Sequence, residues 1–155
     1  MARSGIKMIQ RDLRDEESVV RQCSRQKQVV GEDGAILGVT ADAFKLRVDI
    51  AEEYQSTAWL EYSNGTTDER LRQIVELWRS ERSVRGNCAM VICNAGRIRV
   101  CGQRRSCNLR VRHEPKRTNK AYSTIRRLPY DNSDLELLEL LAADAVVAIK
   151  LIREL

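Results

Sequence analysis

The chain has 155 residues, of which 43% are hydrophobic and 32% are charged. This composition suits a single folded domain that buries a core without help from metals or disulfides. There is no run of about 18 apolar residues and no apolar stretch behind the N-terminal charges, so the sequence predicts neither a membrane helix nor a secretory signal. We expect a cytoplasmic protein in which residues 1–155 form one compact domain.

Charge is unevenly distributed along the chain, whose net charge is +5. Arginines outnumber lysines by 21 to 6, and residues 97–127 alone carry a net charge of +10. Residues 29–66 carry −5 and residues 128–155 carry −4. Such segregation concerns partners and solubility rather than fold.

The first half of the chain alternates between helical and strand patterns. Apolar residues at helical spacing precede the Asp33-Gly34 turn, strict alternation follows it, and Thr66 with Glu69 forms a capping-box pattern. The predicted elements are a helix over 6–28, strands over 35–40, 44–50 and 57–63, and a helix over 67–84.

The second half repeats this rhythm without sequence identity. It predicts strands over 88–93, 97–102 and 107–113, a tight turn at Asn94-Ala95-Gly96, a basic arm over 114–130 and a helix over 134–155. The order α-βββ-α-βββ-arm-α, with short loops between neighbouring strands, predicts an α+β fold with mostly antiparallel sheet packed against helices.

The predicted second sheet has an arginine-lined face. Matching the apolar residues of the predicted strands over 97–102 and 107–113 sets Arg99 opposite Arg110 and Arg97 opposite Arg112. Facing like charges destabilise a sheet, so we expect a compensating partner. A polyanion, an acidic protein partner and a solvated or internally paired surface remain open.

The arm extends this face with basic residues interleaved with hydroxyl, amide and aromatic side chains, as phosphate-binding segments often are. The predicted nucleic-acid-binding residues are Arg97, Arg99, Arg104, Arg105, Arg110, Arg112, Lys116, Arg117, Lys120, Tyr122, Arg126 and Arg127.

The cysteines and the single histidine do not have the spacing of a zinc site. No C-x2-C pair occurs among Cys23, Cys88, Cys93, Cys101 and Cys107, and His113 has no evident group to orient it for catalysis. We expect reduced thiols, no bound metal and no cofactor. Zinc binding by these residues and a redox or nucleophilic role are the alternatives.

The predicted C-terminal helix carries an apolar heptad pattern with further leucines on other faces. It is either a buried core helix of a monomer or the interface of a homodimer, and the pattern favours the homodimer. The predicted interface residues are Leu135, Leu138, Ala142, Ala145, Ile149 and Ile152.

These observations favour a non-catalytic nucleic-acid-binding protein that grips the phosphate backbone, with RNA preferred to DNA. The alternative is a protein-interaction module, an inhibitor or adaptor, that docks an acidic partner protein. A third, more remote possibility is an enzyme that uses cysteine and His113.

Overall fold

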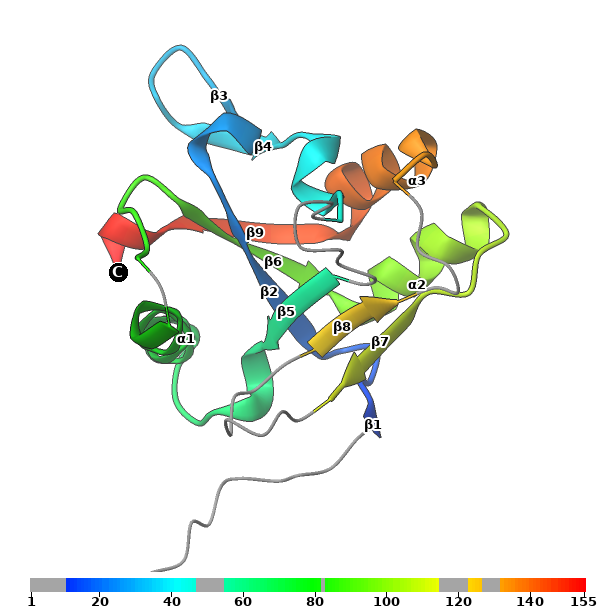
Figure 1. Ribbon diagram of the computed structural model, residues 1–155, viewed down its shortest axis with the longest axis horizontal. Helices are drawn as coiled ribbons and strands as arrows, with labels where there is room; N and C mark the ends of the chain where they lie inside the picture. Colours follow the sequence, from blue (N-terminus) through cyan, green and yellow to red (C-terminus); the bar gives the residue numbers. More distant parts are fainter. Residues whose placement is uncertain (1–10, 47–54, 82, 115–122, 127–131) are drawn as a thin grey trace, which may run out of the picture.

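A computed structural model describes residues 11–46, 55–81, 83–114, 123–126 and 132–155 (Figure 1). It has the predicted α+β architecture, in which a seven-stranded antiparallel sheet packs against helices. The strands are β1 (Arg11–Asp12), β2 (Ser18–Cys23), β3 (Gln28–Val30), β4 (Ile36–Val39), β5 (Gln55–Trp59), β6 (Ala89–Asn94), β7 (Arg110–His113), β8 (Ser123–Arg126) and β9 (Val146–Leu151). The α-helices are α1 (Thr67–Glu81), α2 (Ala95–Arg104) and α3 (Leu135–Leu140).

Short helical turns complete the described part of the chain. Four are 3₁₀ turns and one, directly after α3, is a π turn. They are η1 (Arg25–Lys27), η2 (Ala41–Phe44), η4 (Leu60–Tyr62), the π turn η5 (Leu141–Ala145) and η6 (Ile152–Glu154). No helix in the described ranges is long and apolar enough to cross a membrane.

The large sheet has the strand order β1-β7-β8-β5-β2-β6-β9, and β3 and β4 form a separate hairpin. Strand β6 lies between β2 and β9 and is buried over Ala89–Cys93. Its continuous apolar run reflects this position, because a strand covered on both faces has no polar side.

Helices cover both faces of the sheet and make two hydrophobic cores. Val20 and Ile92 belong to a core completed by α1, whereas Val19 and Val91 belong to a larger core completed by α2, α3 and η2. Figure 1 shows α1 on the other side of the central strands from α2 and α3. The molecule is therefore a three-layer arrangement.

Helix α1 matches its prediction closely. The backbone N–H of Glu69 donates to Thr66 Oγ1 at 3.2 Å, and the N–H of Thr66 donates to Glu69 Oε2 at 3.1 Å, which completes the capping box. The buried residues of the helix are Leu71, Ile74, Val75 and Trp78.

The predicted helix over 6–28 is wrong within the described residues. Residues Ser18–Cys23 form β2, in which Val19 and Val20 point to opposite cores. Two consecutive β-branched residues fit a doubly covered strand better than a helix. Of the other first-half strands, β4 confirms the prediction over 35–40 in its main part. The strand predicted over 57–63 is confirmed only as far as Trp59, because Leu60–Tyr62 form η4. Of the strand predicted over 44–50, Phe44 ends η2 and residues 47–50 lie outside the described ranges.

The predicted turn and strand over 94–102 are also wrong, because these residues form α2. Asn94 caps the helix by accepting the Arg97 N–H at 2.9 Å. The buried residues of the helix recur at helical rather than alternating spacing, and Val100 is 52% exposed. They are Ala95, Ile98, Cys101 and Gly102.

The predicted helix over 134–155 splits into four elements, α3, η5, β9 and η6. Leucines favour helix up to Leu141. Val146, Val147 and Ile149 are β-branched and lie in β9, which pairs with β6. The heptad pattern therefore spans a helix and a strand and is not one seam. Leu138 and Ala145 are fully buried within this chain, and Ile152 is nearly so, while Leu135 is 53% exposed. Homodimerisation stays a prediction, but a continuous C-terminal helix is not available as its interface.

Candidate nucleic-acid interface

Helix α2 and strand β7 carry the described part of the predicted basic surface. Arg97, Arg99 and Arg104 lie on α2, and Arg105 is its C-cap. Arg110 and Arg112 lie on β7, and Arg126 lies on β8. The remaining predicted residues lie outside the described ranges. They are Lys116, Arg117, Lys120, Tyr122 and Arg127.

The predicted facing pairs of arginines are wrong, because β7 pairs with β1 and β8 rather than with residues 97–102. Arg110 instead lies opposite Arg126 in the register, and Arg112 lies opposite Asp12. A like-charged pair therefore exists in the ladder, between different strands from those predicted.

Carboxylates of the same chain lie against most of these arginines. Asp12 accepts from Arg110 Nε at 2.9 Å, Asp15 from Arg99 at 2.6 Å, and Asp144 from Arg104 at 2.5 Å. Arg105 bridges Glu136 at 2.7 Å and Asp134 at 3.2 Å. The acidic and basic blocks that are separate along the sequence are thus mixed in space, because residues 12–15 and 134–144 both pack beside α2.

Arg99 has a structural role in addition to its charge. Its side chain, 25% exposed, donates to Asp15 Oδ1, to the backbone carbonyl of Leu13 and, at 3.5 Å, to the carbonyl of Val111. It therefore ties the segment before β2 to both α2 and β7. The close fit of this segment is also seen at Gly96, where an added Cβ would lie 2.9 Å from the Asp15 Cβ.

Arg97 differs from Arg99 in having no ion pair with any described residue. It is exposed, and the helical repeat places it near Arg104 on one flank of the outer face of α2. Val100 lies at the middle of this face, and Arg99 and Gln103 lie on the flank next to β7. The outer face of α2 therefore presents guanidinium groups along both sides.

A surface pocket lies between α2 and β7. Its volume is about 270 Å³, and both acidic and basic groups line it. Leu109 is buried and gives the pocket an apolar wall. The polar lining residues are Asp12, Arg99, Gln103, Asn108 and Arg110.

A second cluster, which the sequence analysis missed, surrounds His113. The imidazole is 1% exposed, and its ring centroid lies 5.0 Å from that of Trp59 and 5.2 Å from that of Tyr62. The guanidinium of Arg11 lies 4.4 Å from the centroid of the Trp59 ring and binds the carboxylate of Glu17 at 2.8 Å. Only the aromatic character of residues 57–63 pointed to this cluster, since its members come from four separate segments.

The environments of Glu17 and Glu61 shift their pKa values in opposite directions. Burial alone raises the pKa of Glu17, but the hydrogen bond from the Arg14 N–H, with the Arg11 hydrogen bond and both arginine charges, brings it below the ordinary value. Burial raises the pKa of Glu61 despite its hydrogen bonds from the Ser18 N–H. The surroundings of this cluster therefore favour the charged form of Glu17 and the neutral form of Glu61.

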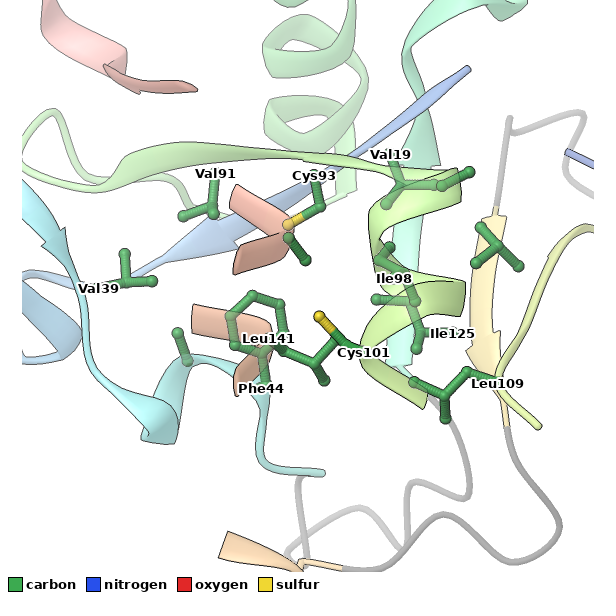
Figure 2. Close-up of a cluster of buried hydrophobic side chains, with 14 of the residues drawn as sticks. Val19, Val39, Phe44, Val91, Cys93, Ile98, Cys101, Leu109, Ile125 and Leu141 are labelled. Carbon is green, nitrogen blue, oxygen red and sulfur yellow. The ribbon is translucent and has the colours of Figure 1, made fainter. Parts of the chain in front are cut away.

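The cysteines do not converge on a common point. Cys23, Cys93 and Cys101 belong to the larger core, where Figure 2 shows the last two, and Cys88 belongs to the core under α1. Burial raises the pKa of the Cys93 thiol to about 12 and that of Cys23 to about 11, which disfavours thiolate chemistry. Among the described residues, no group of three or more His, Cys, Asp or Glu side chains could hold a metal ion.

Comparisons with protein-family models, with curated proteins and with solved structures give no match to this chain. The surface of α2 and β7, with its flanking arginines and its pocket, is therefore the basis for the functional proposal.

Proposed function

We propose that this protein is a non-catalytic RNA-binding protein whose contact surface is the outer face of α2 together with β7. The observation that carries the proposal is the arrangement of guanidinium groups along both flanks of α2, with a surface pocket on the flank next to β7. Arginine and side-chain amides are common phosphate ligands.

The carboxylate partners leave donors available on this surface. A guanidinium has five N–H donors, and Asp12 engages Arg110 at Nε, so the terminal amino groups of Arg110 can still donate. No described residue pairs with the Arg97 guanidinium, so its N–H donors remain available. Phosphate binding therefore does not require the existing ion pairs to break.

The internal pairing also limits the strength expected of the interaction. Neutralised arginines release fewer counterions than free ones, so the salt dependence should be weaker than the sequence block of +10 suggests. We expect a few phosphate contacts rather than ten.

An acidic protein partner is the second candidate, and one observation favours it. Val100 is 52% exposed at the middle of the outer face of α2, with arginines on both flanks, and an apolar centre with a charged rim is typical of protein interfaces. Several of these arginines already form ion pairs with aspartates of the same chain, so they can bind carboxylates.

Competition separates the two candidates. A fluorescently labelled single-stranded RNA is bound to the protein at about 50 mM salt, and then unlabelled RNA, duplex DNA or poly-glutamate of equal total charge is added. The proposal expects RNA to displace the probe at lower concentration than duplex DNA, and poly-glutamate to be the weakest competitor. Failure of the RNA probe to bind, or equal competition by poly-glutamate, would overturn it.

A further inference from the structure

The pocket between α2 and β7 is not built for phosphate alone. Asp12 contributes a carboxylate to its lining, and an aspartate repels a phosphate group. Arg110 occupies one oxygen of this carboxylate, at 2.9 Å, and no described residue donates to the other. A ligand that suits the pocket should therefore bring N–H groups of its own.

The other polar lining groups are guanidiniums, which only donate, and side-chain amides, which donate and accept. The amides of Gln103 and Asn108 form no hydrogen bond with described residues, and both are exposed. Arg110 adds the terminal amino groups that Asp12 leaves available. The pocket thus offers one carboxylate beside guanidinium donors and two amides that can both donate and accept.

Among the four RNA bases, guanine complements this set best. Its N1–H and N2–H₂ are adjacent donors, and a carboxylate can accept a hydrogen bond from each. Its O6 and N7 are adjacent acceptors, and a guanidinium can donate to both with two N–H groups. Adenine and uracil lack both of these two-atom edges, and cytosine lacks the pair of adjacent donors.

The size and wall of the pocket suit an unpaired base. A volume of about 270 Å³ corresponds to about nine waters at ~30 Å³ each and lies just below the usual range for whole small-molecule ligands. Buried Leu109 supplies an apolar surface for a base face. Proteins read RNA sequence mainly from such splayed, single-stranded bases.

We propose that this pocket receives one guanine of single-stranded RNA, with Asp12 accepting from N1–H and N2–H₂ and with Arg110, Gln103 and Asn108 as the donors available to O6 and N7. The inference rests on the proposed function, since the phosphate contacts of α2 would bring the strand to the pocket. It adds a sequence preference that phosphate contacts cannot supply.

The test uses labelled uridine octamers that carry guanosine, adenosine, cytidine or uridine at one central position. We expect the guanosine octamer to bind about tenfold more tightly than the others. Inosine, which lacks the N2 amino group, and 7-deazaguanosine, which lacks N7, should each lose a large part of that preference.

Asp12→Asn is the diagnostic variant. It should abolish the preference for guanosine while leaving affinity for the all-uridine octamer equal or higher, because a negative charge is removed. Asp144→Asn is the matched control, since it makes the same change in another arginine pair outside the pocket, and it should keep the preference.

The outcomes distinguish this inference from the proposed function. Equal binding of all four octamers, a preference for another base, or an Asp12→Asn variant that keeps the guanosine preference would overturn the guanine pocket and leave RNA binding intact. Failure of every octamer to bind would overturn both. The inosine and 7-deazaguanosine octamers need no altered protein, so they test the pocket even if Asp12→Asn does not fold.

Discussion

Arg97 and Arg99 lie two residues apart on α2 but differ in their attachment to the fold. Arg99 bonds the Leu13 carbonyl and Asp15, whereas Arg97 has no ion pair with a described residue. Replacing Arg99 leaves a partly buried carbonyl without a charged donor. We expect Arg99→Gln to lower the free energy of unfolding by about 1.5–3 kcal/mol.

The matched variant Arg97→Gln should change the free energy of unfolding by less than about 0.5 kcal/mol, as exposed substitutions usually do. Urea unfolding of both variants measures the difference. Equal costs would contradict the structural role assigned to Arg99. Removing Arg99 relieves no cross-strand repulsion, because Arg99 does not face Arg110 in a sheet.

Glu17 should make the fold sensitive to acid. Its pKa is lower in the folded protein than its ordinary value of 4.5, so its carboxylate stabilises the fold above that value. This contribution is lost as the pH falls below about 4.5 and through the folded pKa. Glu17→Gln should therefore be less stable at neutral pH and should lose less further stability on acidification.

Glu61 should behave in the opposite way, because its pKa is raised in the fold. As the pH falls from neutral toward 4.5, the folded protein takes up a proton at Glu61 before the unfolded chain does, which stabilises the fold. Glu61→Gln removes that gain. Chemical unfolding between about pH 7 and pH 4 measures both effects, and parallel profiles for the two variants would contradict these assignments.

At the scale of elements, α3 contains a matched pair of leucines. Leu138 is fully buried in the larger core, whereas Leu135 is 53% exposed. Leu138→Ala should lower the free energy of unfolding by about 2–5 kcal/mol, and Leu135→Ala should change it by less than about 0.5 kcal/mol. Thermal or urea unfolding provides the measurement.

This pair also bears on the predicted homodimer. Light scattering on the wild type and on Leu135→Ala gives the mass in solution. A dimer that Leu135→Ala dissociates would place the exposed side of α3 in an interface. Strand β9 is a poor alternative, because a register shift near Val147 and the charged Lys150 both hinder edge-to-edge pairing.

Sequence patterns predicted elements well where local and tertiary signals agreed. The capping box and the apolar stripe of α1 both predicted a helix. The continuous apolar run of β6 predicted a buried strand. The α+β class followed from the order and spacing of the elements. These features depend on residues close together in the chain.

The failures have a common physical cause. Residues 97–102 alternate as a strand does, but Asn94 caps a helix and Ile98 and Cys101 are one turn apart. Residues 134–155 show heptad spacing, but β9 gains a ladder with β6 that the sequence does not reveal. In both segments the pattern fitted two structures. The Asn94 cap and the packing of one helix face favour the helix α2, whereas pairing with β6 favours the strand β9.

The candidate site was predictable only in part. The basic block includes Arg99 and Arg110, which line one pocket, although they lie on a helix and a strand rather than on one sheet. Its acidic partners and the pocket could not be predicted, because Asp12 and Asp144 come from distant segments. The cluster around His113 escaped for the same reason.

At the scale of the whole molecule, the fold reduces the charge contrast seen along the sequence. Acidic residues from both ends of the described chain neutralise much of the basic block, so α2 presents a surface of mixed charge with a few available guanidinium groups. This arrangement predicts RNA binding that depends on identifiable arginines rather than on net charge.

The salt dependence of RNA binding by Arg97→Gln tests whether binding depends on this arginine rather than on net charge. The control is Arg79→Gln, which removes an equal charge from an exposed position near the end of α1, on the opposite face of the sheet. Affinity for a single-stranded RNA is measured at several salt concentrations between about 50 and 200 mM. We expect Arg97→Gln to weaken binding and to reduce the log–log salt slope by about 0.7, the value for one phosphate contact on a single strand, whereas Arg79→Gln should leave the slope unchanged. Identical slopes for wild type and Arg97→Gln, or equal changes in both variants, would contradict a phosphate-binding surface on α2.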